Sequence, residues 1–420
     1  MTEMVADYLI KASQANAQKW DVIVVGGGMV GAALAVGLGK ENVKVLVLER
    51  KLPNLEWHSD LPYQPRVSAL TRASENILKN LGAWQGIERR RYHPFTDMHV
   101  WDESTTAQVH FSALDMGEPN LGYIVENRLV QAALWEPMIK LDNVKVLVGE
   151  TLQKLELEAD QACLFLENGL QLKANLVVAA DGAGSQVRTL ANIGLETHDY
   201  EQCAVVGCVK TELPHLDTCW QRYRKDGPFA FLSMVNNVSS VAWYLPIEKM
   251  PWALSLSDAD FSKAIETASD FKLGAVSEVG ERVAFPLVRR HAEHYVKPHF
   301  ALVGDAAHTI NPQAGQGVNL GFLDAAALIE TLVMARQRHK SIGQLSVLRR
   351  YERWRRGDNA LVQRSMEGFD WLFKQDSSLK TSFRKAVMPM ANQIKPVKNW
   401  LMSQALNGRE ALPKLAQFIK

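Results

Sequence analysis

The sequence predicts an α/β fold made of a discontinuous parallel-sheet domain, an inserted β-rich domain and a helical C-terminal region. Three observations support this prediction. Apolar runs that suit buried strands end in glycines or an acidic residue near residues 26, 181 and 304. Much of the chain between the second and third of these junctions is rich in β-branched and aromatic residues, which favour strands. The chain after Asp324 repeats apolar residues at helical spacing, so the last part is expected to be helical.

The first junction consists of a strand, a glycine-rich loop, a helix and a second strand. The β-branched run 21–25 is followed at once by the sequence GGGMVG at residues 26–31, and residues 32–40 suit a helix. A second apolar run, 44–48, ends at Glu49. Glycines at this spacing between a strand and a helix, with an acid after the next strand, are typical of a Rossmann-like dinucleotide site.

Each residue of this fingerprint has an expected role. Gly26 permits the tight turn, Gly28 allows the backbone to approach a pyrophosphate, and Gly31 lets the helix pack closely. Glu49 would accept hydrogen bonds from ribose hydroxyls and would repel a 2′-phosphate. We therefore expect the adenine nucleotide bound here to be FAD or NAD rather than NADP.

Two further junctions lie later in the chain. Apolar strands also end at Asp181-Gly182 and at Gly304-Asp305. A glycine-containing loop after the last of these opens a helix, and the exposed N–H groups of a helix N-terminus favour negative charge. An anionic or electron-accepting group is therefore expected on residues 315–319. Three such junctions indicate one large cofactor that spans the sheet.

Local patterns predict the elements between the first two junctions. Residues 51–65 carry three prolines and are expected to form a loop. Arg66, at the end of that loop, either contacts a phosphate or is an ordinary solvated arginine. The remaining expected elements are a helix over 71–81, a strand pair over 99–111, a strand over 123–127, a helix over 128–140 and hairpin strands between 144 and 172.

The late position of the third junction means that the first domain is interrupted. We expect this domain to comprise residues 20–95, 120–200 and 287–345, the β-rich domain to comprise 96–119 and 201–286, and the helical region to comprise 346–420. One helix, over 258–270, is expected to interrupt the strands of the β-rich domain. The cleft between the two domains is the natural place for a substrate.

Composition excludes several classes of function. The 420-residue chain has a formal net charge of +1, which gives no electrostatic footprint for nucleic acid. We find no apolar run of about 18 residues, so no membrane-spanning segment is expected, and residues 1–20 lack the apolar core of a signal peptide. The four cysteines have no metal-binding spacing. Reduced thiols, a cytoplasmic location and no metal are therefore expected.

The C-terminal region is basic. Residues 380–420 hold eight lysines and arginines against one acid, and their prolines would divide the stretch into short helices. The basic face either is solvated or touches anionic lipid, where each well-placed cation contributes about 1 kcal/mol.

These motifs together resemble those of the single-component FAD-dependent aromatic hydroxylases. The resemblance rests on residues 26–31 with Glu49, on Asp181-Gly182 and on the stretch 304–319. It implies a para-hydroxybenzoate hydroxylase-like fold, in which a discontinuous Rossmann-like FAD-binding domain carries an inserted β-sheet substrate domain. The stretches most similar to the ubiquinone-biosynthesis hydroxylases of that family are 66–69, 122–127, 226–232, 285–287 and 304–321.

The resemblance implies roles for particular residues. The implied cofactor-binding residues are Gly26, Gly28, Gly31, Glu49, Arg66, Asp181, Gly182, Gly304, Asp305, Pro312, Gly317, Val318 and Asn319. The residues implied at the reacting flavin ring are Pro312, Gly315, Gln316 and Gly317. The implied substrate-pocket residues, which could equally be plain core, are Phe229, Phe231, Leu232, Phe285, Pro286 and Leu287. His308 would be a general base or, more in keeping with its position beside the loop, a structural hydrogen-bonding partner.

The chemistry implied by the resemblance uses NAD(P)H and O2 to hydroxylate an electron-rich ring through a flavin C4a-hydroperoxide. The ring would belong to a polyprenylated quinol or phenol. Residues 91–94, 220–221 and 289–291 are most similar to the members that act on demethoxyubiquinol, whereas the helix around 348–353 resembles the members that act earlier, on a polyprenylphenol.

Two other hypotheses remain open at this point. The protein could be a flavin reductase that acts on a prenyl chain. It could also be a non-catalytic flavin- or lipid-binding subunit of a ubiquinone-biosynthesis complex, peripheral to the inner membrane through its basic C-terminal region.

Overall fold

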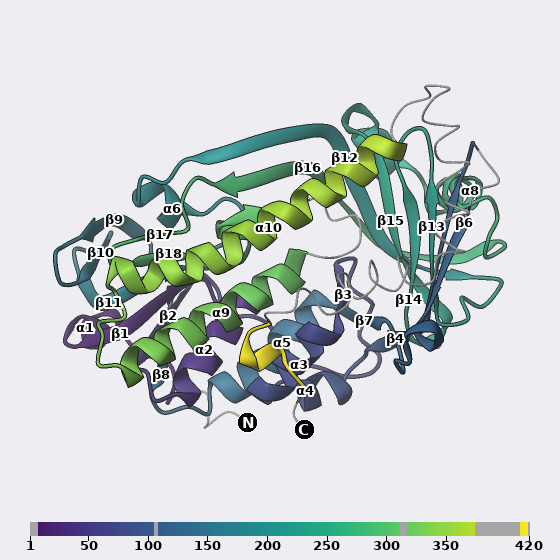
Figure 1. The fold of residues 1–420 in the computed structure, drawn as a ribbon. Helices are drawn as coiled ribbons and strands as arrows, with labels where there is room; N and C mark the ends of the chain where they lie inside the picture. Colours follow the sequence, from purple (N-terminus) through teal and green to yellow (C-terminus); the bar gives the residue numbers. More distant parts are fainter. Residues whose placement is uncertain (1–6, 105–107, 311–316, 374–411, 419–420) are drawn as a thin grey trace.

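The computed structural model describes residues 7–104, 108–310, 317–373 and 412–418. Two large β-sheets lie at opposite ends of an elongated molecule, and long helices run between them (Figure 1). A sheet of three strands lies between the two large sheets. The arrangement is the α/β fold that the sequence predicts.

The first sheet brings the three predicted junctions together. Its strand order is β17-β18-β11-β1-β2-β8, with β10 and β9 extending from β11. Neighbouring strands from β18 to β8 are parallel, so the carboxyl ends of β18, β11 and β1 are adjacent at one edge. The strands are β1 (Lys19–Val25), β2 (Val45–Glu49), β8 (Val144–Val148), β9 (Leu152–Leu157), β10 (Ala162–Leu166), β11 (Gln171–Ala179), β17 (Val296–Lys297) and β18 (Phe300–Leu302).

One prediction about this sheet is wrong. Residues 144–148 were expected to form a hairpin with the strands that follow them. They instead form β8, which pairs in parallel with β2, because the apolar run suits a fully buried strand as well as a hairpin strand. The antiparallel hairpin consists of β9, β10 and the first part of β11.

Helices cover the first sheet in contact with one another. α2 (Met29–Lys40) packs against α5 (Asn127–Met138) and α9 (Gly317–Gln337), and α10 (Leu345–Phe373) packs on α9 (Figure 1). α3 (Arg72–Leu81) starts at the expected place, because the Thr71 side chain accepts a hydrogen bond from Ser74 N, and it ends at Gly82 in the left-handed conformation. The shorter helices are α1 (Ala12–Asn16), α4 (Trp84–Glu88) and α6 (Gln186–Leu190).

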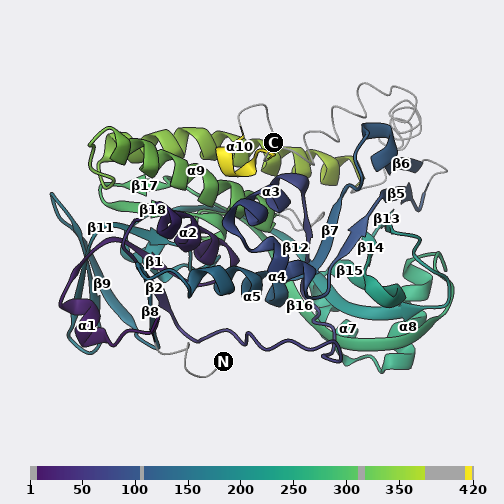
Figure 2. The ribbon, with the colours of Figure 1, turned by 90° about the horizontal axis from the view of Figure 1, so that it is seen from below.

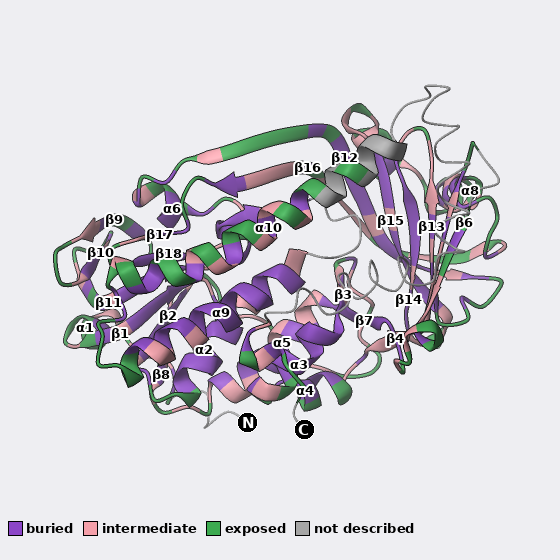
Figure 3. Ribbon diagram, viewed as in Figure 1, coloured by how far each residue is buried: buried purple, intermediate pink, exposed green. Residues whose placement is uncertain are grey.

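α9 corrects the expectation that the chain has no segment apolar enough to cross a membrane. Its 21 residues include an 18-residue window of mean hydropathy 1.6. Of that window, 72% is buried inside the protein, and Figure 3 shows α9 as almost wholly buried while α10 keeps an exposed face. The apolar composition of α9 therefore suits a helix enclosed by α2, α3 and α10.

The second large sheet is built on two strands of 17 residues each, β12 (Leu195–Thr211) and β16 (Val276–Ala292). They pair with each other along most of their length. The sheet order is β19-β16-β12-β15-β14-β13-β5-β6. The other strands are β5 (Asp97–Asp102), β6 (Gln108–Ser112), β13 (Thr218–Tyr223), β14 (Phe229–Ser233), β15 (Val238–Pro246) and β19 (His308–Thr309).

Two helices cover the outer face of the second sheet. α7 (Met250–Ser255) and α8 (Asp258–Ala268) lie at the end of the molecule opposite the first sheet (Figure 2). The sequence predicts α8 but not α7, so the expectation of a single helix in this region is wrong. α7 has Pro251 at its second position, where proline is tolerated because the N–H it lacks would have no partner.

The small central sheet and the C-terminal segment complete the fold. The small sheet contains β3 (Val67–Leu70), β7 (Gly122–Glu126) and β4 (His93–Phe95). Residues 412–418 return to α3, where the Asn76 and Asn80 side chains donate to the carbonyls of Ala416 and Leu415 at 3.1 and 2.8 Å. The helices expected between residues 380 and 411 lie outside the described residues.

Candidate functional site

The glycine-rich loop after β1 combines two packed glycines with one that faces open space. Gly26 has φ +104°, and a Cβ there would lie 2.5 Å from the Ala180 carbonyl oxygen. A Cβ at Gly31 would collide with the Gly26 carbonyl. A Cβ at Gly28 would meet no atom of the described part of the chain within 4 Å. The loop is therefore shaped by Gly26 and Gly31, while Gly28 leaves room for a ligand against the backbone.

Glu49 is fixed to this loop. Its Oε2 accepts a hydrogen bond from Gly27 N at 2.5 Å. The Gly27 carbonyl in turn accepts from Gln131 Nε2 at 3.0 Å and from Trp135 Nε1 at 2.8 Å, both on α5. One face of α5 therefore holds the loop, a contact that the sequence pattern did not indicate.

Arg128 occupies the same face of α5 one turn earlier, since residues three and seven apart lie on one side of a helix. Its Nε and one terminal nitrogen are buried and have no hydrogen-bond partner in the described part of the chain. A buried guanidinium without a partner is costly, so this position favours an anionic ligand beside the glycine-rich loop. Sequence reasoning missed Arg128, although its helical spacing to Gln131 and Trp135 could have identified it.

The second junction is joined to the third by Arg188. Asp181 accepts a hydrogen bond from Val187 N at 3.2 Å through Oδ2, whereas its buried Oδ1 has no partner among the described residues. Gly182 has φ +84°. Arg188 donates to the carbonyls of Ala183 at 3.2 Å and Ala306 at 2.9 Å, which fixes the two loops relative to each other.

Asp305 is accessible to solvent although many protein atoms surround it. The residue is exposed, yet desolvation by these atoms raises the pKa of its carboxyl, against the opposing influence of His308, Arg66 and Arg290. An accessible carboxylate in such surroundings is available to a ligand. The preceding Gly304 has φ +58° and fits closely against the Val30 side chain.

The start of α9 is tied to the beginning of α3. Asn319 is buried, and its Oδ1 accepts from Thr71 N at 3.1 Å and from Ser74 Oγ at 2.7 Å, while its Nδ2 donates to Ala69 O at 2.8 Å. These contacts give the Asn319 side chain a positioning role. A Cβ at Gly317 would meet none of the described residues within 4 Å, and Val318 is half-buried. The predicted residues Pro312, Gly315 and Gln316 lie outside the described residues.

Arg66 lies where the first domain meets the second sheet. Its guanidinium carbon is 5.7 Å from the centre of the Phe285 ring. The side chain is exposed and forms no ion pair with any residue that the structure describes. Arg66 is therefore available to an anionic group near Asp305, on whose carboxyl it acts electrostatically.

The six predicted pocket residues do not share one face of the second sheet. Phe229 and Phe231 are buried with Trp243 and Phe261 beneath α7 and α8. Pro286 pairs with Cys203, which belongs to the same outer core. Because side chains alternate along a strand, the six predicted residues point to both faces of the sheet.

The remaining three members of that set face inward. Leu232 packs with Val67 and Ala69 of the small central sheet. Phe285 and Leu287 belong to a cluster that includes Tyr244. The face turned toward the first domain therefore carries Leu232, Phe285 and Leu287.

His308 is held as a structural hydrogen-bonding partner, as expected. Its Nε2 lies 2.5 Å from Asp324 Oδ2, and both side chains are fully buried. Its Nδ1 is buried without a partner among the described residues.

Within the described ranges, one group of side chains comes close enough to hold a metal ion, and none of its members belongs to the three junctions. His93, His215 and Asp217 place their ligand atoms within 4.8 Å of one another. Both ring nitrogens of His215 are already engaged, with Asp217 N at 3.1 Å and with Met234 O at 2.8 Å. The group therefore fastens β4 to the second sheet rather than presenting an open set of ligands.

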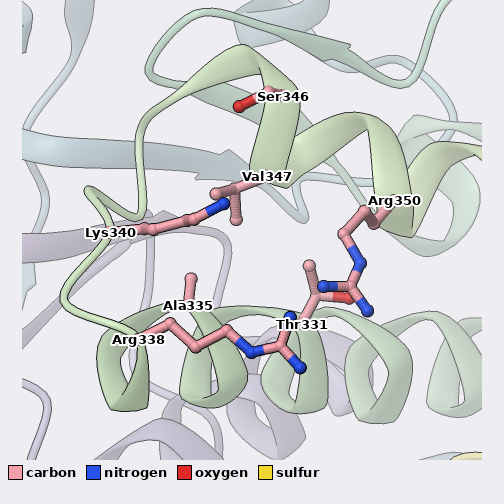
Figure 4. A pocket seen from close by; sticks show the side chains of 7 residues that line it. All are labelled: Thr331, Ala335, Arg338, Lys340, Ser346, Val347 and Arg350. Atoms are coloured by element: carbon pink, nitrogen blue, oxygen red, sulfur yellow. The ribbon is translucent and has the colours of Figure 1, made fainter.

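A surface hollow of about 90 Å³ lies between the end of α9 and the start of α10 (Figure 4). Thr331, which lines it, lies about 20 Å along the helix from Gly317, since an α-helix rises about 1.5 Å per residue. The hollow is therefore remote from the three junctions. Its other lining residues are Ala335, Arg338, Lys340, Ser346, Val347 and Arg350.

Comparisons with known proteins agree with this geometry. A family model described as an FAD binding domain matches residues 19–364. The 3-demethoxyubiquinol 3-hydroxylase of Escherichia coli K12 is 40% identical over 352 residues, which cover 84% of this chain and 89% of that protein. The ubiquinone hydroxylase UbiL of Rhodospirillum rubrum is 33% identical over 386 residues, or 92% and 89% of the two chains.

Solved structures share the fold. The p-nitrophenol 4-monooxygenase PnpA of Pseudomonas putida DLL-E4 superposes with a TM-score of 0.75 at 21% identity and covers 94% of this chain and all of that one. The flavin-dependent monooxygenase PieE, solved in complex with FAD and substrate, has a TM-score of 0.66 at 17% identity, with 93% and 72% of the two chains covered.

Proposed function

Since this chain belongs to the FAD-binding family of flavoprotein monooxygenases, we propose that it hydroxylates the ring of a polyprenylated ubiquinone precursor, at the demethoxyubiquinol step. The chain is an FAD-dependent monooxygenase by family. The observation that carries the substrate proposal is the 40% identity, over 84% of the chain, to a protein named as a 3-demethoxyubiquinol 3-hydroxylase.

The three junctions fit FAD. The space at Gly28, which no described side chain fills, admits a pyrophosphate against the backbone, and Arg128, two of whose buried nitrogens lack a partner among the described residues, supplies positive charge beside it. Glu49 keeps acceptor capacity for ribose hydroxyls at the end of β2. In this proposal Gly26 and Gly31 shape the loop, and these residues together hold the ADP half.

The second and third junctions would hold the remainder of the cofactor. Asp305 would accept hydrogen bonds from the ribityl hydroxyls. The Oδ1 of Asp181, which has no partner among the described residues, would face the cofactor beside Gly182. Gly304 would let the loop approach closely, and Arg66 would stand near the phosphates.

The start of α9 would receive the flavin ring. The N-terminal turn of this helix, from Gly317 through Val318 to Asn319, carries the positive end of the helix dipole, which favours a negative charge on reduced flavin. The expectation that Pro312, Gly315, Gln316 and Gly317 border the reacting ring belongs to this proposal. When bound, FAD supplies the redox chemistry by accepting a hydride from NAD(P)H and activating O2.

The inner face of the second sheet would orient the substrate ring and exclude water. Leu232, Phe285 and Leu287 present apolar surface on this face. Because water near the reduced cofactor would favour unproductive loss of peroxide, this apolar wall contributes by shielding as well as by contact. The polyprenyl chain of a quinol or phenol is matched by such a surface.

A peripheral contact with the inner membrane, or with a ubiquinone-biosynthesis complex, is part of the same proposal. It is supported by the excess of seven positive charges over residues 380–420. A polyprenylated substrate partitions into lipid, so a cytoplasmic enzyme that works at the membrane surface would meet it there.

Incubating the purified enzyme with NADPH, labelled O2 and a short-chain demethoxyubiquinol tests the function. We expect one labelled oxygen atom in the quinol ring, detected by mass spectrometry. Label that enters a polyprenylphenol but not demethoxyubiquinol would move the enzyme to the earlier step. NADPH oxidation without label in either ring would overturn the proposal.

A further inference from the structure

A fully buried carboxylate lies directly beneath the loop that carries Asp305. Asp324, on α9, is 0% exposed. Its Oδ2 accepts hydrogen bonds from Gly304 N at 3.1 Å and from His308 Nε2 at 2.5 Å. It therefore binds the backbone immediately before Asp305.

The other oxygen of the same carboxylate is held by α10. Asp324 Oδ1 accepts from Arg355 Nε at 2.9 Å and from Asn359 Nδ2 at 3.1 Å. Arg355 also donates to Asn359 Oδ1 at 2.9 Å, so the two α10 side chains are fixed to each other. One carboxylate thus joins a helix of the C-terminal region to the Gly304 peptide.

The set of partners fixes the ionisation of Asp324. Gly304 N, Arg355 Nε and Asn359 Nδ2 can only donate, so each of the two oxygens must accept. Burial alone would raise the pKa of Asp324, but His308 and Arg355 lower it to about 2. An amide at this position would direct a donor at another donor, which makes the ionised carboxylate the group that satisfies the site.

α10 holds the flanks of the Asp305 loop as well. Gln363 Nε2 donates to the carbonyls of Arg290 at 3.1 Å and Thr309 at 3.2 Å. Thr309 lies on β19, and Arg290 lies opposite it on β16. The helix therefore contacts the chain on both sides of Asp305.

We propose that Asp324 is a positioning residue for the flavin, and that it makes cofactor binding depend on the docking of α10. The inference rests on the proposed role of Asp305 in holding the ribityl chain. Gly304 adopts φ +58°. Because glycine has no Cβ, its own backbone does not restrict it to this conformation. The hydrogen bond from its N–H to Asp324 selects one orientation of the Gly304-Asp305 peptide.

Glu352 provides the matched control. It lies on the same helix and its carboxylate also accepts a backbone N–H, from Tyr295 at 2.7 Å. Its contact fastens α10 to the chain between β16 and β17, outside the Asp305 loop. A Glu352→Gln variant keeps an acceptor for Tyr295 N but turns this charge-assisted hydrogen bond into a weaker neutral one, so it loosens one docking contact of α10 without touching Gly304.

The experiment measures FAD binding and the flavin midpoint potential in four full-length proteins: wild type, Asp324→Asn, Asn359→Ala and Glu352→Gln. We expect the FAD dissociation constant to rise at least tenfold in Asp324→Asn and severalfold in Asn359→Ala, which keeps the ion pair and should fold. Loss of the buried negative charge should also make the potential of any retained flavin more positive in Asp324→Asn. In Glu352→Gln, the FAD dissociation constant should stay within twofold of the wild-type value and the midpoint potential should be unchanged.

The outcomes are separable. If wild type fails to bind FAD, the proposed function is wrong. If wild type binds FAD and Asn359→Ala binds it equally tightly, the positioning role is overturned. This outcome can be read even if Asp324→Asn does not fold. Equal losses in Glu352→Gln and Asn359→Ala would also overturn it, because general helix docking would then explain the effect.

Discussion

The first and third junctions of the sheet, to which we assign the same cofactor, are held in place in different ways. The loop after β1 is shaped by its own glycines, since Gly26 and Gly31 contact each other, and Glu49 binds it from the next strand. The loop after β18 is held by Asp324 and, through it, by Arg355 of α10. A loop at the end of a strand can thus be fixed either by local backbone packing or by a buried charge held from a distant helix.

Gly31→Ala should give the largest effect. It tests whether backbone packing between glycines supports the loop after β1. A Cβ there would collide with the Gly26 carbonyl, and backbone cannot move aside as a flexible side chain can. We expect the unfolding free energy to fall by about 3 kcal/mol, measured by urea denaturation of the apo-protein.

The matched control is Gly28→Ala, whose Cβ would meet no residue that the structure describes within 4 Å. It should change stability by less than about 0.5 kcal/mol but weaken FAD binding. Equal stability losses in the two variants would contradict the division of roles within the loop.

The pH dependence of stability tests whether the charge of Asp324 supports the loop after β18. Asp324 has a folded-state pKa of about 2 against an ordinary value of 3.8. Its contribution is therefore present above pH 4 and is lost as the pH falls toward 2. The shift corresponds to about 2 kcal/mol at neutral pH.

Unfolding of wild type and Asp324→Asn should be followed by denaturant titration at pH 6 and near pH 2. The difference between their unfolding free energies should shrink by about 2 kcal/mol at the lower pH. A difference that stays constant with pH would show that Asp324 acts through packing rather than through its charge.

Arg128→Met should give a smaller effect, on binding rather than folding. Removing a charge-assisted contact to phosphate should weaken FAD binding by roughly tenfold to thirtyfold. The apo-protein should be as stable as wild type or more so, because two buried guanidinium nitrogens have no partner there among the described residues. Titration of apo-protein with FAD, alongside thermal unfolding, distinguishes this result from a general loss of stability.

The first junction could be predicted from the sequence, whereas the support of the third junction could not. The β1, α2 and β2 unit is encoded within about 30 residues by apolar runs and glycine spacing, and these elements appear where expected. The support of the third junction joins Asp324 to Arg355, and the anchor of Asn319 reaches Thr71. No local pattern records pairings over such separations.

The second sheet shows another limit. Alternation along β14 separates Phe231 from Leu232, but it does not say which face α7 and α8 cover. The six residues predicted for the pocket or the core therefore divide between the two faces, with Phe229, Phe231 and Pro286 on the face that α7 and α8 cover.

The most direct test of the account is FAD retention by Asp305→Ala. The Asp305 residue is exposed, so removal of its carboxylate should leave the fold intact. We predict folded protein, with a circular dichroism spectrum and melting temperature like those of wild-type apo-protein, that purifies with little FAD. Full flavin retention at the wild-type dissociation constant would contradict the assignment of this junction to the cofactor.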